Sequence, residues 1–370
     1  MNPTLSIWLE LSRVLAALVV FVGHSVALGV APQEVGMAWH RTADDAVTAF
    51  FVISGLVIAH STRASKATLS DYALARLSRV YSVALPTVLF ALAVDHMGMH
   101  FDVTQYAPNW QYPKLWLYLP LHWLFLGETW LGAIYPFTMA PYWSLGYEVW
   151  YYVLFGCITF LAGRTRWVVV AAVLLIMGPR IWLLLPTWWL GVVLLRWLDR
   201  LRMGRGAAFG LMALALAAYA LFLLSGVRGA TDAASRQLYA WFSSVLTAPF
   251  HQGSTVHVLS DYVVALLFAA FLVGCASCRF GFGTRAEALI RAAAAHTFTF
   301  YLIHFTLLVF ARALGYASVS WGVYGGILGA ILITTWGLAR IGEQRRGWYR
   351  TLFARAWRAL SGLRGALKFS

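Results

Sequence analysis

The chain alternates long apolar segments with short clusters of basic residues from one end to the other. Apolar runs of about 18 residues or more are typical of transmembrane helices, because about 20 helical residues span the ~30 Å hydrocarbon core of a bilayer. We therefore predict an all-α integral membrane protein with about ten transmembrane helices. The predicted helices are residues 8–30, 44–60, 76–95, 142–162, 167–179, 181–198, 206–225, 259–277, 296–314 and 320–340.

One further apolar stretch, 114–134, is interrupted by Pro120 and Glu128, and we interpret it as interfacial or re-entrant. Lys and Arg concentrate in cytoplasmic loops, so the basic residues test this choice. With ten helices, most of the 28 basic residues fall on the cytoplasmic side. An eleventh helix would move the clusters at 164–166 and 196–205 outside. We therefore expect cytoplasmic N- and C-termini and an uncleaved first helix.

Composition agrees with this interpretation and defines the domains. The chain is 61% hydrophobic and 11% charged, against about 25% charged in soluble domains. We expect one membrane domain, 1–340, and a basic tail, 341–370, that forms an amphipathic helix on the anionic inner leaflet. The net charge of +14 lies beside the predicted helices rather than on a soluble module, which argues against nucleic-acid binding. The three cysteines do not suggest a disulfide framework.

The first predicted helix contains two residues that are costly inside a membrane, Arg13 and His24. Eleven residues at about 100° each give about 1100°, roughly 20° from three full turns. Arg13 and His24 therefore share one face, about 16 Å apart along the axis. A cation at one end and a base at the other predict a reaction along that face.

Two motifs follow on the next helices. Residues 50–55 read FFVISG, in which Ser54 and Gly55 either let two helices approach closely or make room for a thin ligand. Arg76 and Arg79 are spaced i, i+3 and so lie on one helical face. Two guanidinium groups there suit phosphate binding, although ordinary positive-inside anchoring also explains them.

Two more motifs carry polar groups in aromatic surroundings. Residues 143–152 read WSLGYEVWYY, which places Ser144 and Glu148 on one face. Glu148 would orient His24, pair with an arginine or bind a sugar hydroxyl, and a purely structural ion pair explains it equally well. Residues 301–304 read YLIH, and this His is either a pocket residue or a buried, hydrogen-bonded group. Near the end of the chain, a glycine pattern argues for helix packing at Gly322, Gly325, Gly326 and Gly329.

These five motifs, in this order over 8–340, resemble the acyltransferase-3 family of integral-membrane acyltransferases. The chain departs from the family at Val47-Thr48-Ala49, where members often carry an acid just before the Phe pair. It also lacks the C-terminal esterase-like domain of some members, and so resembles the stand-alone form. The resemblance implies transfer of an acyl group, usually acetyl from acetyl-CoA, to a hydroxyl of a sugar or envelope glycan.

The resemblance and the residue pattern together give each candidate a role. Arg76 and Arg79 would hold CoA phosphates, Arg13 would line the inner channel, and His24 would act as general base. Glu148 would orient His24 or the acceptor. The remaining candidates would line the pocket or stabilise the oxyanion, namely Ser54, Trp143, Ser144, Tyr301 and His304. A backbone N–H could equally stabilise the oxyanion.

Several partners and two other function classes follow from the same pattern. The expected partners are acyl-CoA as co-substrate, a glycan or lipid-linked sugar acceptor, membrane lipids and envelope biosynthesis proteins. We expect the protein in the inner (plasma) membrane, with no bound metal or permanent cofactor. A secondary transporter of an acylated sugar or another anion is the main alternative, because intramembrane Arg and His also suit a transport path. A non-catalytic membrane scaffold is the third, and it leaves these costly residues without a task.

Overall fold

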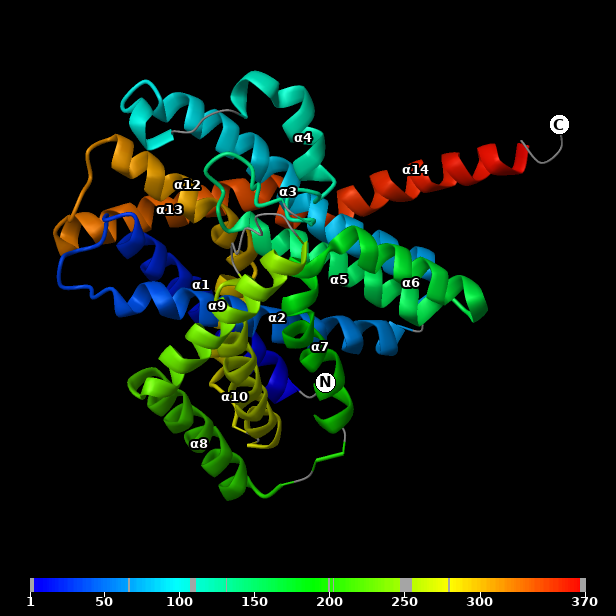
Figure 1. The fold of residues 1–370 in the computed structure, drawn as a ribbon, viewed down its shortest axis with the longest axis horizontal. Helices are drawn as coiled ribbons and strands as arrows, with labels where there is room; N and C mark the ends of the chain where they lie inside the picture. The colour runs from blue at the N-terminus through cyan, green and yellow to red at the C-terminus, as the bar shows by residue number, and fades with distance from the viewer. Residues whose placement is uncertain are drawn as a thin grey trace.

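The structure is a computed structural model that describes residues 3–65, 67–106, 111–130, 132–198, 200–201, 203–246, 255–278 and 280–366. This part of the chain is helical, with no β-strand among the described residues, so the prediction of an all-α membrane protein is confirmed (Figure 1). The helices are α1 (Pro3–Ala27), α2 (Ala38–Ser65), α3 (Leu69–Gly98), α4 (Leu115–Trp123), α5 (Tyr142–Phe160), α6 (Gly163–Met177), α7 (Pro179–Leu198), α8 (Arg205–Leu224), α9 (Gly226–Leu246), α10 (Val258–Ser277), α11 (Thr284–Ala294), α12 (Thr297–Ala313), α13 (Trp321–Ile341) and α14 (Arg346–Ala366). Each of the ten predicted transmembrane segments coincides with one of them.

Seven helices among the described residues are long and apolar enough to cross a membrane, namely α1, α2, α3, α7, α8, α10 and α13. The count is eight if α11 and α12, which meet at a bend of 53°, form one broken span. The other two predicted spans are α5 and α6. With 15 residues, α6 is about 22 Å long, shorter than the hydrocarbon core of about 30 Å.

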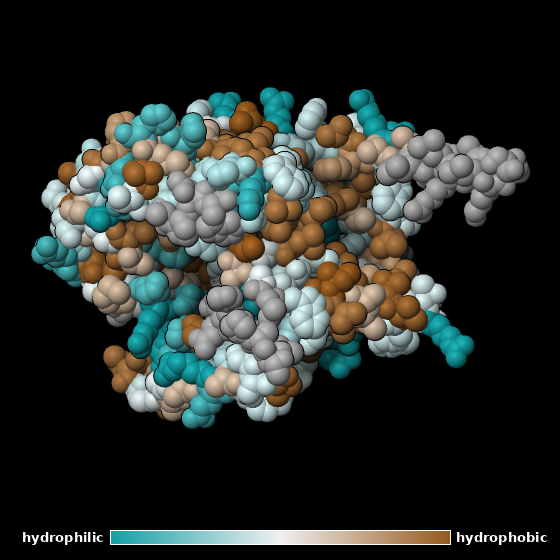
Figure 2. Space-filling model, turned by 45° about the horizontal axis from the view of Figure 1, so that its top comes forward, coloured by the Kyte–Doolittle hydropathy of each residue, from teal (hydrophilic) through white to brown (hydrophobic). Residues whose placement is uncertain are grey.

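The surface is that expected for helices in lipid. Large apolar side chains are exposed on α6, α8 and α13, and the visible face in Figure 2 carries broad apolar areas with hydrophilic groups toward its margins. Exposed apolar area on this scale is unfavourable in water and favourable against acyl chains. The stripe of α13 glycines belongs to this surface, since a Cβ at Gly322, Gly325, Gly326 or Gly329 would meet no described atom within 4 Å. The glycines therefore do not pack α13 against another described helix of this chain.

The stretch predicted to be interfacial or re-entrant contains the nine-residue helix α4, which is too short to span a bilayer. The surrounding segment is attached to the end of α3 through buried Asp95, which accepts hydrogen bonds from the Tyr112 hydroxyl (2.8 Å) and from the Thr138 backbone N–H (3.0 Å) and hydroxyl (2.6 Å). Within α4, burial lowers the pKa of His122 to about 3, and its Nε2 lies 2.8 Å from Gln111 Oε1. This segment is therefore attached to the end of α3 by these hydrogen bonds.

Helix α9 was not predicted from the sequence, which indicated only a long outer segment at 226–258. One face of α9 is polar and buried, and it contains Arg228, Asp232 and Ser235. Arg228 of α9 pairs with Asp45 of α2 at 2.7 and 3.1 Å, and Tyr219 of α8 donates to the same carboxylate at 2.7 Å. Asp45 thus attaches α8 and α9 to α2.

Helices α2 and α7 cross at very short range. A Cβ at Gly55 would lie 2.0 Å from the carbonyl oxygen of Trp188, and one at Gly191 would lie 2.0 Å from that of Val52. Only glycine permits this approach, so Gly55 has the packing role that its motif suggested. The crossing fixes the rotation of α2 and, with it, the direction of Ser54.

Candidate active site

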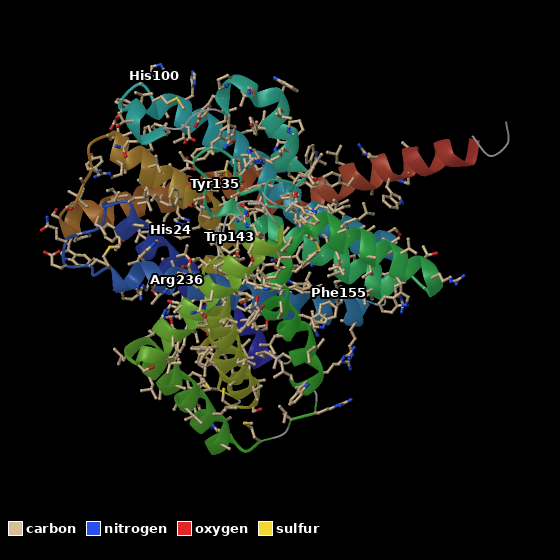
Figure 3. The ribbon with its side chains drawn as sticks, in the orientation of Figure 1. His24, His100, Tyr135, Trp143, Phe155 and Arg236 are labelled. Atoms are coloured by element: carbon tan, nitrogen blue, oxygen red, sulfur yellow. The ribbon has the colours of Figure 1, made fainter. Side chains whose placement is uncertain are left out.

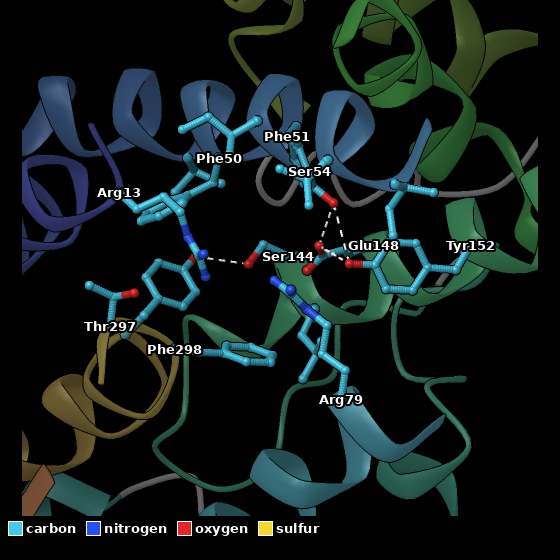
Figure 4. Close-up of a pocket in the computed structure, with 16 residues that line it drawn as sticks. Arg13, Phe50, Phe51, Ser54, Arg79, Ser144, Glu148, Tyr152, Thr297 and Phe298 are labelled. Atoms are coloured by element: carbon cyan, nitrogen blue, oxygen red, sulfur yellow. Dashed lines mark hydrogen bonds between the residues drawn. The ribbon is translucent and has the colours of Figure 1, made fainter. Parts of the chain in front are cut away.

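A pocket lies where α1, α2, α3, α5 and α12 meet, with about 730 Å³ of space that includes open solvent at its mouth (Figure 4). Half of its sixteen lining residues are apolar and half are polar or charged. The polar lining residues are Arg13, Ser54, Arg79, Ser144, Glu148, Tyr152, Thr297 and Tyr301. Convergent polar groups set beside apolar and aromatic side chains are typical of a small-molecule site.

The basic end of the pocket is formed by α1 and α3. Helix α3 begins with a capping box in which Thr68 and Asp71 satisfy each other's backbone N–H groups, and this sets the helix two turns before the arginines. Arg13 and Arg79 point toward the middle of the pocket from opposite sides (Figure 4). Two guanidinium groups facing one space are chemically suited to an anion with several oxygens.

Arg76 lies beside this pocket rather than in its wall. Its guanidinium carbon is 5.8 Å from the ring centroids of both Tyr72 and Tyr152. Its Nε is buried and finds no hydrogen-bond partner in the described part of the chain. Arg76 therefore keeps unused hydrogen-bonding capacity next to Arg79.

Glu148 is held at the middle of the pocket by hydroxyl groups. Ser54 donates a hydrogen bond to Glu148 Oε1 at 2.5 Å, and Tyr152 donates to the same oxygen. Ser54 in turn accepts from Trp188 Nε1 at 3.1 Å. Glu148 therefore faces the arginines and makes no direct contact with His24 among the described interactions. Its predicted role of orienting His24 is not supported by a contact.

The far end of the pocket is closed by a pair of hydroxyls. Ser144 Oγ lies 2.8 Å from the Tyr301 hydroxyl and 3.0 Å from the carbonyl oxygen of Pro141. Ser144 donates its hydroxyl hydrogen to this carbonyl, so the Tyr301 hydroxyl donates to Ser144 Oγ. Both hydroxyl hydrogens are therefore used in hydrogen bonds. The Tyr301 ring is 6.1 Å from the ring of His304, so Tyr301 separates the pocket from the histidines beyond it.

His24 pairs with His304, and the two form the polar centre beyond Tyr301. His24 Nδ1 is 2.8 Å from His304 Nε2, and the two rings stack at 5.1 Å with 9° between their planes. His304 Nδ1 lies 3.2 Å from the carbonyl oxygen of Phe300, which only accepts hydrogen bonds, so Nδ1 carries the hydrogen. His304 Nε2 is then an acceptor, His24 donates from Nδ1, and the lone pair of His24 is on Nε2.

Aromatic side chains hold this histidine pair in place. Phe305 contacts His24 edge-on at 5.1 Å, and Phe21 lies 6.3 Å from His304. His24 is near the end of α1 opposite Arg13, in the part of the molecule where α1 passes α12 (Figure 3). The structure thus places a base with a defined tautomer on the helix that also carries Arg13.

The structure brings most of the predicted residues into two adjoining groups. The pocket contains Arg13, Ser54, Arg79, Ser144, Glu148 and Tyr301. The second group is His24 with His304, and Arg76 is next to the first group. Trp143 packs on Phe51 at 6.0 Å and on Tyr147 at 5.2 Å and does not line the pocket.

Sequence reasoning missed Tyr152, Thr297 and Phe298 as lining residues. Tyr152 lies one helical turn after Glu148 in the WSLGYEVWYY motif, and the i, i+4 spacing was a signal that could have identified it. Thr297 and Phe298 carry no such signal, since they lie at the bend between α11 and α12 and reach the pocket only because of it.

Residues 6–340 match the acyltransferase family described as "Acyltransferase domain". The chain belongs to this family. The match covers nearly the whole of this membrane acyltransferase, including every residue of both groups, and it confirms the resemblance seen in the five motifs. No curated protein and no solved structure matches the chain.

Proposed function

We propose that this membrane acyltransferase is an O-acyltransferase that moves an acetyl group from cytoplasmic acetyl-CoA to a hydroxyl of a cell-surface or exported glycan, in the inner (plasma) membrane. One observation carries the proposal. A single helix, α1, presents Arg13 to an arginine-lined pocket and His24, with a defined tautomer, beyond the other end of that pocket. An anionic donor and a hydroxyl acceptor require these two kinds of group.

The donor occupies the pocket from its basic end. Arg79 and Arg13, with Arg76 beside them, bind the phosphates of CoA through charge-assisted hydrogen bonds. The pantetheine arm is thin enough to run past Ser54 and the apolar wall toward Tyr301. Glu148 balances the arginines in the empty pocket and, held by two hydroxyls, stays aligned with the arm.

His24 Nε2 acts as the general base. It takes the proton of the acceptor hydroxyl as the oxygen attacks the thioester carbonyl, and the imidazolium then returns this proton to the departing CoA thiolate as the C–S bond breaks. His304 Nε2 accepts the hydrogen bond from His24 Nδ1 throughout, which favours the positive imidazolium in the transition state.

The Tyr301–Ser144 contact lies at the end of the donor pocket that is nearest His304. When the acyl end of the donor arrives, the Tyr301 hydroxyl turns from Ser144 to the thioester carbonyl. This change provides an oxyanion donor only while the thioester is bound.

The test is release of CoA by the purified protein in lipid nanodiscs, supplied with acetyl-CoA and a glycan acceptor. His24→Gln, which keeps size and polarity but not basicity, is expected to lower kcat by at least about 100-fold, in line with the usual contribution of a general base. His100→Gln is the matched control, since His100 lies on the exposed surface at the end of α3. Near-full activity of a folded His24→Gln protein would refute the base assignment, and absence of CoA release by the wild type with any glycan would favour the transport alternative.

A further inference from the structure

The turn that joins α13 to α14 is fixed against α3 next to the basic end of the pocket. A Cβ at Gly342 would lie 2.5 Å from the carbonyl oxygen of Ser82 and 3.0 Å from Pro86 Cγ, so the chain touches α3 directly at this point. Ser82 is three residues after Arg79 on α3. The first residues beyond Gly342 therefore reach the arginines.

Glu343, the first residue beyond this contact, is bound at a defined place. Its Oε2 accepts hydrogen bonds from the backbone N–H (3.2 Å) and the hydroxyl (2.8 Å) of Thr299 on α12. It is close enough to Arg13 and Arg79 to interact with both charges. Glu343 is thus a counter-ion to Arg13 and Arg79 that is attached to α12.

Arg346, in the first turn of α14, adds a further cation at the same place. Its Nη2 donates to the carbonyl oxygen of Ala75 at 3.0 Å, and its charge interacts with the like charges of Arg79, Arg76 and Arg350. The following part of α14 is attached to α3 by Phe353, whose ring is 5.6 Å from that of Tyr81. Arg346 is solvent-exposed, and these two contacts keep its guanidinium group beside the arginines of α3.

The cluster has more positive than negative charge. Four arginines, Arg13, Arg76, Arg79 and Arg346, face only two carboxylates, those of Glu148 and Glu343. Arg346 is repelled by Arg79, Arg76 and Arg350, and such an arrangement beside a low-dielectric pocket is costly unless an anion completes it. The excess of positive charge fits a phosphate or pyrophosphate group.

We propose that Arg346 of α14 completes a three-arginine phosphate-binding site with Arg76 and Arg79, so that the C-terminal helix forms part of the donor site. The inference rests on the proposed function for its ligand, a phosphate group of CoA. A phosphate of an anionic lipid has the same chemistry, and α14, which is basic and lies beside the membrane-spanning helices, would also meet that source.

The experiment measures CoA binding by isothermal titration with the full chain in phosphatidylcholine nanodiscs. Arg346→Gln is expected to weaken CoA binding about tenfold, as for loss of one charge-assisted hydrogen bond. Arg355→Gln is the matched control, because it removes the same charge from an exposed position further along α14 and is expected to bind CoA like the wild type. Equal affinity of Arg346→Gln and the wild type would overturn the proposal.

A second arm separates this proposal from the proposed function. If the wild type binds no CoA, the donor assignment is refuted, and nanodiscs with and without phosphatidylglycerol then decide on the arginine site. Thermal stabilisation by phosphatidylglycerol that Arg346→Gln loses and Arg355→Gln keeps would support the site with a lipid phosphate as ligand. Equal stabilisation of the two variants would overturn it.

Discussion

His304 gives the most informative perturbation of the site, because it touches His24 and does not line the donor pocket. His304→Phe keeps an aromatic ring but removes the acceptor at 2.8 Å from His24 Nδ1. Without it, His24 no longer has one favoured tautomer, and its imidazolium loses a hydrogen bond in the transition state. A hydrogen bond to a charged group contributes about 1.5–3 kcal/mol, so kcat should fall by about 10- to 150-fold.

The effect should appear in kcat and not in donor binding. The KM for acetyl-CoA is expected to stay near its wild-type value, since the arginines and Glu148 are untouched. His304→Gln restores an acceptor oxygen for His24 and should recover part of the lost rate. The assay is steady-state CoA release at a series of acetyl-CoA concentrations.

Two results would refute this reasoning. A wild-type kcat in His304→Phe would mean that the pairing does not position the base. Equal losses in the Phe and Gln variants would mean that only the shape of the histidine ring matters. In either case the tautomer assigned to His24 would lose its functional significance.

Two further predictions concern stability. Gly55→Ala should lower the free energy of unfolding by about 1–3 kcal/mol, because the added methyl overlaps the Trp188 carbonyl, whereas Gly322→Ala, which meets open space, should not; thermal unfolding of both variants checks this. The pKa of His122 falls from 6.5 to about 3 on folding. Its contribution to the free energy of unfolding is therefore fully present above pH 6.5 and is lost as the pH falls toward 3. The loss is about 2 kcal/mol at pH 5. Unfolding of His122→Gln should therefore depend less on pH between 7 and 5, and an unchanged pH dependence would contradict the assignment.

The helices were largely predictable because their signal is local. An apolar run of membrane-spanning length excludes other structures, since a backbone in lipid must bond to itself. Helix α9 escaped this signal because its buried face is polar. Its burial depends on the partner of Arg228, which is Asp45 on a helix 183 residues earlier in the chain.

The relative positions of site residues were predictable only where the residues lie on one helix. The shared face of Arg13 and His24 follows from helical geometry alone. The pairing of His24 with His304 joins residues 280 apart and depends on how α1 and α12 pack, which no local pattern specifies. The direction of Glu148 depends in the same way on the rotation of α5, and α5 turns it toward Ser54.

The central claim is that the face of α1 joins a donor on the arginine side of the membrane to an acceptor on the histidine side. Its most direct test uses sealed proteoliposomes of known orientation, with labelled acetyl-CoA on one side and the glycan acceptor on the other. We predict labelled glycan only when acetyl-CoA is on the arginine side and the acceptor on the histidine side, and none with His24→Gln. Labelled glycan with both substrates confined to one side, or undiminished labelling by His24→Gln, would contradict the account.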